Sequence, residues 1–169
     1  MTPADTNTTT ATAATAVTAV TATAEVRAAA DALIAAFAGN RVDEYFAAFA
    51  PDATFLFHST PQRLGSTTEY RALWQSWVDH DDFRVLGCSS SHPSIQLFGD
   101  TAVFSHDVET RTGTRAGEDT VRERETIVFH RTGNTGNTGN TREPARWLAV
   151  HEHLSPHHAP QHAPAAAPD

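Results

Sequence analysis

The chain has 169 residues, 40% of them hydrophobic, which suits one domain with a buried core and is too little for two. Its formal net charge is −8 and it contains no lysine, so we expect no nucleic-acid partner, because such binding needs clustered cations. No stretch approaches the roughly twenty apolar residues that cross a bilayer, so no membrane partner is expected. The single cysteine, Cys88, excludes an intramolecular disulfide, and the N-terminus does not resemble a signal peptide, which together favour a cytoplasmic location.

Three segments lack the large apolar residues that would offset the entropy of ordering. Residues 1–23 are mostly Thr and Ala, residues 132–143 contain the run GNTGNTGN, and residues 156–169 are rich in Pro, His and Ala. The sequence therefore predicts a disordered leader, a flexible hairpin loop and a disordered tail, with the folded domain at residues 24–155.

Three helices are predicted before the strands. Residues 25–38 repeat apolar side chains at three and four residue steps, and a second short helix precedes Pro51. The string Ser66-Thr67-Thr68-Glu69 has the spacing of a capping box and predicts the start of a third helix. The apolar face of that helix is formed by Tyr70, Leu73, Trp74, Trp77 and Val78.

The rest of the chain predicts strands, because residue types alternate with a period of two. The predicted strands are residues 53–58, 83–88, 94–98, 101–111, 121–131 and 146–154. Helices followed by long antiparallel strands predict an α+β domain, with three N-terminal helices packed on the concave face of a cone-shaped, curved antiparallel sheet.

Polar groups interrupt three of the apolar rows on these strands. Glu125 follows Val121 and Glu123 in one row, Glu152 lies among apolar residues in another, and His106 lies between Phe104 and Val108 in the third. A carboxylate in an apolar row must find a partner, take up a proton or face a polar cavity. Glu123 has the same parity as Glu125 but lies nearer the hairpin loop, so we expect it to reach solvent.

We predict that His106, Glu125 and Glu152 converge on one cavity, where they would act as catalytic acid and base groups without a cofactor. The alternative is a satisfied buried hydrogen-bond network with no chemistry. The predicted ligand-binding residues are His58, Tyr70, Trp74, Trp77 and Phe104, which would supply stacking area and polar contacts to an unknown small molecule. The alternative for the two tryptophans is a place in the core.

The pair His151 and His153 has the spacing of a possible metal chelate on a strand. Two histidines need a third ligand, and no motif supplies one. We therefore predict no metal site and expect both histidines to serve packing or a dimer face.

Several strings resemble the nuclear transport factor 2-like superfamily, and within it the SnoaL-like domains. They are FAAFAPDATFLFH, RLGSTTEYRALW, IQLFGDTAVFSHDVETR, ERETIVFHR and RWLAVHEHLSP. The resemblance covers residues 25–156. The last two are also similar to the end of the association domain of calmodulin-dependent kinase II. The resemblance implies a cystatin-like roll and a homodimer, but no single activity, since the superfamily hosts enzymes, binding domains and oligomerisation domains.

Members with ketosteroid isomerase activity carry a catalytic carboxylate after the string that here reads PDATFLF. Phe57 and His58 occupy that place, so the isomerase residues are not carried over. The predicted function is the binding of a small, largely apolar molecule, with cofactor-free acid–base chemistry of the isomerase, dehydratase or hydrolase type. The alternative is a non-catalytic association module that uses the outer sheet face, with Arg122, Arg124, Trp147, His151 and His153.

Overall fold

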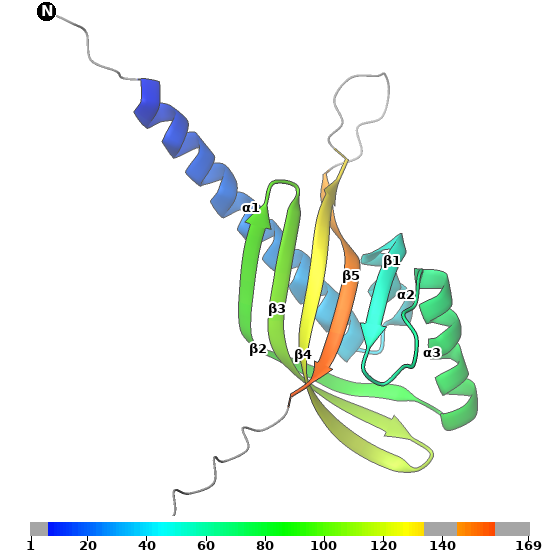
Figure 1. Ribbon diagram of the computed structural model, residues 1–169. Coiled ribbons are helices and arrows are strands. Elements are labelled where there is room, and N and C mark those ends of the chain that lie inside the picture. The colour runs from blue at the N-terminus through cyan, green and yellow to red at the C-terminus, as the bar shows by residue number, and fades with distance from the viewer. Residues whose placement is uncertain (1–6, 134–144, 158–169) are drawn as a thin grey trace, which may run out of the picture.

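The computed structural model describes residues 7–133 and 145–157, with side chains from residue 19 onward. The elements are α1 (Asn7–Ala38), α2 (Val42–Ala47), β1 (Phe49–Phe57), α3 (Thr67–Asp81), β2 (Arg84–Phe98), β3 (Thr101–Thr114), β4 (Gly117–Thr132) and β5 (Arg146–Pro156). The sheet order is β1-β5-β4-β3-β2, and every pair is antiparallel except β1 with β5. The predicted α+β class with a curved sheet is confirmed (Figure 1).

The three helices cover one face of the bent sheet (Figure 1). α1 packs mainly against β2, whereas α3 packs against β1. β2, β3 and β4 are 14 to 16 residues long, well beyond the usual five or six, so they extend past the helices and curl. The sheet and helices together form a cone.

Large apolar side chains fill the narrow part of this cone. Those with less than 2% exposure are Val26, Tyr45, Phe55, Phe104, Ile127 and Phe129. On β3 buried and half-buried residues alternate from Thr101 to Thr110, as expected of a strand with one covered face. Burial of each large apolar side chain stabilises the fold by about 1.5 to 3 kcal/mol, before entropy is counted.

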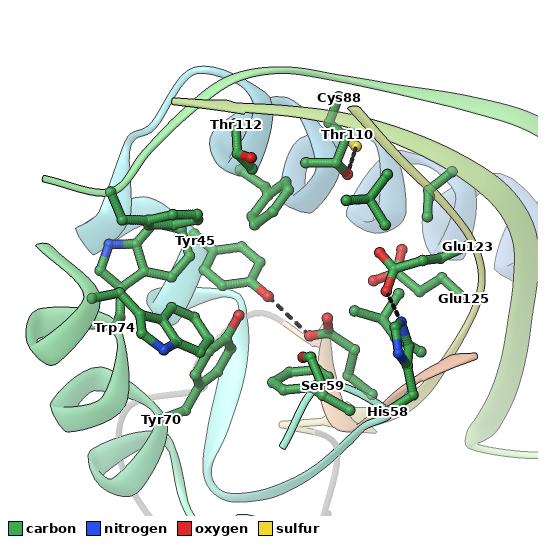
Figure 2. A pocket seen from close by; sticks show the side chains of 18 of the residues that line it. Tyr45, His58, Ser59, Tyr70, Trp74, Cys88, Thr110, Thr112, Glu123 and Glu125 are labelled. Atoms are coloured by element: carbon green, nitrogen blue, oxygen red, sulfur yellow. Dashed lines mark hydrogen bonds and ion pairs between the residues drawn. The ribbon is translucent and has the colours of Figure 1, made fainter. Parts of the chain in front are cut away.

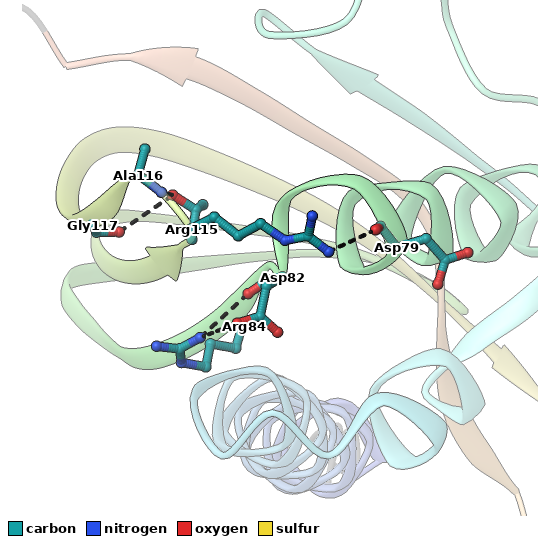
Figure 3. Close-up of polar contacts among 7 residues, drawn as sticks. Asp79, Asp82, Arg84, Arg115, Ala116 and Gly117 are labelled. Carbon is teal, nitrogen blue, oxygen red and sulfur yellow. Dashed lines mark hydrogen bonds and ion pairs between the residues drawn. The ribbon is translucent and has the colours of Figure 1, made fainter.

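Both ends of α3 are fixed by side chains. Ser66 Oγ accepts a hydrogen bond from the Glu69 amide, and Glu69 Oε2 accepts one from the Gly65 amide, at 3.2 and 2.7 Å. At the other end Asp82 adopts a left-handed conformation. The tip of the β3–β4 hairpin contacts this end, where Arg115 donates to the backbone carbonyls of Asp79 and Asp81 (Figure 3). These contacts join the hairpin tip to the end of α3.

The structure differs from the expectation of a disordered leader, because α1 begins at Asn7. Alanine has the highest helix propensity, and the packed second half of α1 provides the nucleus from which the helix extends through the Thr/Ala stretch. The expected strands 83–88 and 94–98 form one strand, β2, with an irregularity between Ser91 and Ser94. The expected hairpin loop and tail fall largely on residues 134–144 and 158–169, which lie outside the described residues.

A β-bulge in β5 reverses the alternation of its side chains. Val128 pairs with His151 and Phe129 pairs with Ala149, so Val150 is the extra residue. Trp147 therefore points inward, where its Nε1 donates to Glu25 of α1 at 3.1 Å. The placement of Trp147 on the outer face is wrong for this reason.

Candidate functional site

A cavity of about 400 Å³ lies between the helices and the concave face of the sheet. Its helical wall is apolar and aromatic, with Phe37, Trp74 and Trp77, while its sheet wall carries Glu125 and other polar groups. Figure 2 shows Tyr70 and Trp74 on one side of the cavity and Glu123 and Glu125 on the other.

Glu152, on β5, is one of two glutamates buried in this wall, with 2% exposure. Its Oε2 accepts a hydrogen bond from the Tyr45 hydroxyl at 2.9 Å, which joins α2 to the sheet (Figure 2). Burial raises the pKa of Glu152 well above its ordinary value, and the adjacent Glu125 raises it further. These two effects favour the protonated form of Glu152. Burial also raises the pKa of Tyr45, so its hydroxyl remains a donor.

Glu125, on β4, is the second buried glutamate, with 8% exposure. Its Oε2 contacts His106 Nε2 on β3, the residue directly opposite it in the register. The other ring nitrogen, Nδ1, lies 2.6 Å from Ser90 Oγ on β2. The three side chains form a hydrogen-bonded chain across neighbouring strands, from the exposed Ser90 to the cavity.

Burial sets the protonation of this chain. It raises the pKa of Glu125 to about 7 and lowers the pKa of His106 to about 4, so the imidazole is neutral at neutral pH. A neutral imidazole has one ring proton for two contacts. When Glu125 is ionised, Nε2–H donates to it and Ser90 donates to Nδ1; when Glu125 is protonated, both directions reverse. His106 can thus stabilise either state of Glu125.

A second glutamate–histidine pair lies at the mouth of the cavity. His58 Nε2 is 2.5 Å from Glu123 Oε1, and the side chains are 34% and 13% exposed. This contact bridges the end of β1 to β4 (Figure 2). The expectation that Glu123 reaches open solvent is wrong, because the strand bends over the cavity and carries this side chain into its wall.

The structure brings most of the predicted site residues together. The predicted residues that line the cavity are His58, Tyr70, Trp74, Trp77, Glu125 and Glu152. His106 lies behind Glu125 with no exposed side-chain surface, so it meets a ligand only through that glutamate. Phe104 is fully buried opposite Ile127 and belongs to the core instead of the cavity, because the narrow end of the cone is filled there.

Two functional groups escaped the sequence reasoning. Tyr45 lies on the second short helix, to which the sequence analysis assigned no functional residue, although a tyrosine among phenylalanines brings a hydroxyl that needs a partner when buried. Glu123 lies on the same side of its strand as Glu125, and this shared parity was the signal in the sequence that could have placed it in the cavity wall.

Cys88 also lines the cavity, but burial raises its pKa to about 11, so it is a neutral thiol and a poor nucleophile.

Within the two described ranges, no cluster of three or more His, Cys, Asp or Glu side chains is arranged to hold a metal ion. His151 instead contacts Thr54 Oγ1 at 2.7 Å across the parallel β1–β5 pair. Among the described helices, none has the length and apolar character needed to cross a membrane.

The fold is shared with several solved structures. One is a protein of unknown function in nutrient uptake from Rhodospirillum rubrum, described as NTF2-like, with a TM-score of 0.63 and 17% identity over 78% of this chain and 97% of that one. Another is a putative calcium/calmodulin dependent protein kinase II association domain from Xanthomonas campestris, with a TM-score of 0.59, 19% identity and coverage of 79% and 86%. A third, from Catenulispora acidiphila in complex with S-DNPA, has a TM-score of 0.61, 12% identity and coverage of 80% and 92%.

These identities are low, so the likeness establishes the fold and not an activity. None of the curated proteins compared with the chain matches it. The sequence model of the SnoaL-like domain, however, matches residues 26–159, which is most of the chain and includes the whole described sheet. The chain therefore belongs to the SnoaL-like domain family.

Proposed function

We propose that the cone cavity binds a small, largely apolar molecule and that Glu125 and Glu152 exchange protons with a polar group on it. One observation carries this proposal: two carboxyl groups with different proton affinities lie in one apolar cavity of about 400 Å³. Buried carboxyls cost stability, and perturbed titratable groups in a cleft are a feature of functional sites.

The environments of the two carboxyls suggest different roles. Burial and the neighbouring Glu125 raise the pKa of Glu152 well above its usual value, which suits a general acid, whereas Glu125, with a pKa of about 7, suits a general base. Tyr45 orients the first and His106 the second. This pair would support isomerisation, dehydration or hydrolysis without a cofactor. The Catenulispora protein, bound to S-DNPA, shares the fold and supports a ligand-holding role for this cavity.

Tryptophan emission provides a direct test, because Trp74 and Trp77 line the cavity and Trp147 does not. Titration with a panel of neutral, anionic and cationic compounds of different apolar bodies should change the emission for at least one class. The control is Trp74→Phe with Trp77→Phe, in which the emission of Trp147 should not respond to the same compound. A panel that leaves the wild-type emission unchanged would contradict the proposal.

The double variant Glu125→Gln with Glu152→Gln separates this function from an association module. Both substitutions preserve size and remove the exchangeable carboxyl proton. A protein with acid–base function should lose turnover of any substrate found and keep its fold by circular dichroism. If the variant retains full turnover, the carboxyl pair has no catalytic role.

A further inference from the structure

The charged groups that line the cavity are almost all acidic. Four carboxyl side chains belong to its wall: Asp81, Glu123, Glu125 and Glu152. His58 is the only basic side chain among the described lining residues, and it is already paired with Glu123. The chain has no lysine, and none of its described arginines reaches the cavity.

Several described arginines pair with carboxylates outside the cavity. Arg27 pairs with Asp31, Arg71 with Asp43, and both pairs lie on the surface. The groups that act electrostatically on the buried glutamates are carboxyls as well: Glu123 raises the pKa of both Glu125 and Glu152. Among the residues that the structure describes, none thus provides a cation to the inner end of the cavity.

The wall opposite the carboxyls is aromatic. Trp74 and Trp77, with ring centroids 6.4 Å apart, and Tyr70 face the cavity from α3. Figure 2 shows this aromatic side across the cavity from Glu123 and Glu125. A ligand that contacts both walls needs an apolar body at one end and a group that complements carboxylates at the other. Aromatic faces also attract cations, so the aromatic wall favours a cationic ligand as well.

We infer that the cavity selects hydrophobic amines, with the ammonium group at Glu125 and Glu152 and the apolar body against α3. This inference rests on the proposed function and specifies its ligand class. An anionic ligand of the same shape would bring an unpaired charge into a poorly hydrated space and would oppose the ionisation of Glu125, so we expect it to be excluded. A neutral ligand gains the apolar contact but not the ion pair.

Proton release is a consequence of such binding. Glu125, with a pKa of about 7, must be ionised to pair with an ammonium group, so binding near neutral pH displaces its proton. The described titratable groups that act on Glu125 come from every element around it: His106 from β3, Cys88 from β2, Glu123 on its own strand, Glu152 from β5, Tyr45 from α2 and Tyr70 from α3. Burial keeps His106 neutral and raises the pKa values of Tyr45, Tyr70 and Cys88. The pKa of Glu152 is also raised well above its usual value, so Glu125, with a pKa of about 7, is the group that we expect to respond near neutral pH.

Three compounds with one apolar body test the inference: phenylbutylamine, phenylbutanol and phenylbutyrate. Their phenyl rings do not interfere with selective excitation of tryptophan, and calorimetry gives an independent affinity. We expect the amine to bind at least about tenfold more tightly than the alcohol, and the acid to bind more weakly than either. The affinity for the amine should rise between about pH 6 and about pH 8, and calorimetry in buffers of different ionisation enthalpy should detect released protons.

Glu125→Gln with Glu152→Gln should reduce the preference for the amine over the alcohol to about twofold or less, while the alcohol still binds. The matched control is Glu118→Gln with Asp119→Asn, which removes two exposed carboxylates from the same strand and should preserve the preference. Equal or tighter binding of the alcohol or the acid overturns the amine inference and leaves the proposed cavity function standing. If none of the three compounds binds, the amine inference fails, and the wider panel described above then decides the fate of the proposed function.

Discussion

Glu123 and Glu125 lie two residues apart on β4, and each contacts a histidine. The two glutamate–histidine pairs differ in how far they are exposed to solvent. Glu123 and His58 meet at the mouth, with side chains 13% and 34% exposed. Glu125 and His106 meet in the interior, with side chains 10% and 0% exposed. Both pairs join a glutamate to a histidine, so the comparison shows how exposure to water changes the same interaction.

In the interior, burial disfavours both charged forms. It raises the pKa of Glu125 and lowers that of His106, so the pair exists near neutral pH with a neutral imidazole and a carboxyl close to its titration midpoint. At the mouth, solvent screens the interaction and hydrates both partners. The interior pair therefore suits proton exchange, while the mouth pair suits a bridge between β1 and β4.

The largest expected effect is a decrease in the unfolding free energy with rising pH, which depends on Glu125 and should be absent from the Glu125→Gln variant. Because the folded-state pKa of Glu125 is raised from 4.5 to about 7, its stabilising contribution is complete below pH 4.5 and is lost as the pH rises through about 7. At about 1.4 kcal/mol for each tenfold change in acidity, the unfolding free energy of wild type relative to the variant should fall by about 3 kcal/mol. Urea unfolding at several pH values measures this. Tyr45→Phe, which retains Glu125, should keep the decline.

His106→Leu should break the interior pair. The substitution leaves the buried Glu125 without its ring partner and should lower the unfolding free energy by about 2 kcal/mol near neutral pH. Urea unfolding again provides the measurement. A loss no larger than that of the equivalent change at the mouth would show that burial does not distinguish the two pairs.

Tyr45→Phe tests the contribution of the hydrogen bond to Glu152, the other buried carboxyl. It removes the hydroxyl that donates to Glu152 Oε2 at 2.9 Å and leaves the ring packing intact. We expect a loss of about 1 kcal/mol, the ordinary net value of one hydrogen bond. Thermal unfolding detects a change of this size. An unchanged midpoint would mean that water or Glu125 replaces the lost donor without cost.

His58→Leu should have the smallest effect. The pair at the mouth is partly hydrated, so its loss should change the unfolding free energy by roughly 0.5 kcal/mol. The matched variant is His106→Leu, measured in the same urea series. A loss equal to that of His106→Leu would indicate that the bridge from β1 to β4 is needed for the fold itself.

Some of the site was predictable because it depends on local periodicity. The alternation along β3 and β4 predicted that His106 and Glu125 point to the covered face, and the uninterrupted β3–β4 register keeps them opposite each other. The capping string predicted the start of α3 with its aromatic face. The roles of His106, Glu125 and the aromatic residues of α3 in binding and catalysis remain predictions.

Other features could not be read locally. The bulge at Val150 reversed the side chains of β5 before it, so Trp147 points inward, although no residue type marks this position. Phe104 shares the parity of cavity residues, yet it lies where the cone is filled. Tyr45 joined the site because α2 packs over Glu152, more than a hundred residues away in the chain.

The sequence by itself determined the α+β class and which face of β3 and β4 carries His106 and Glu125, because side chains alternate along any extended backbone. Only the tertiary structure decided which of those inward groups share a cavity, which are sealed behind others and which still meet water. These properties depend on the curvature of the sheet, on one extra residue in a strand and on where the helices pack. The protonation of Glu125 and Glu152 follows from burial, and burial is a property of the assembled cone.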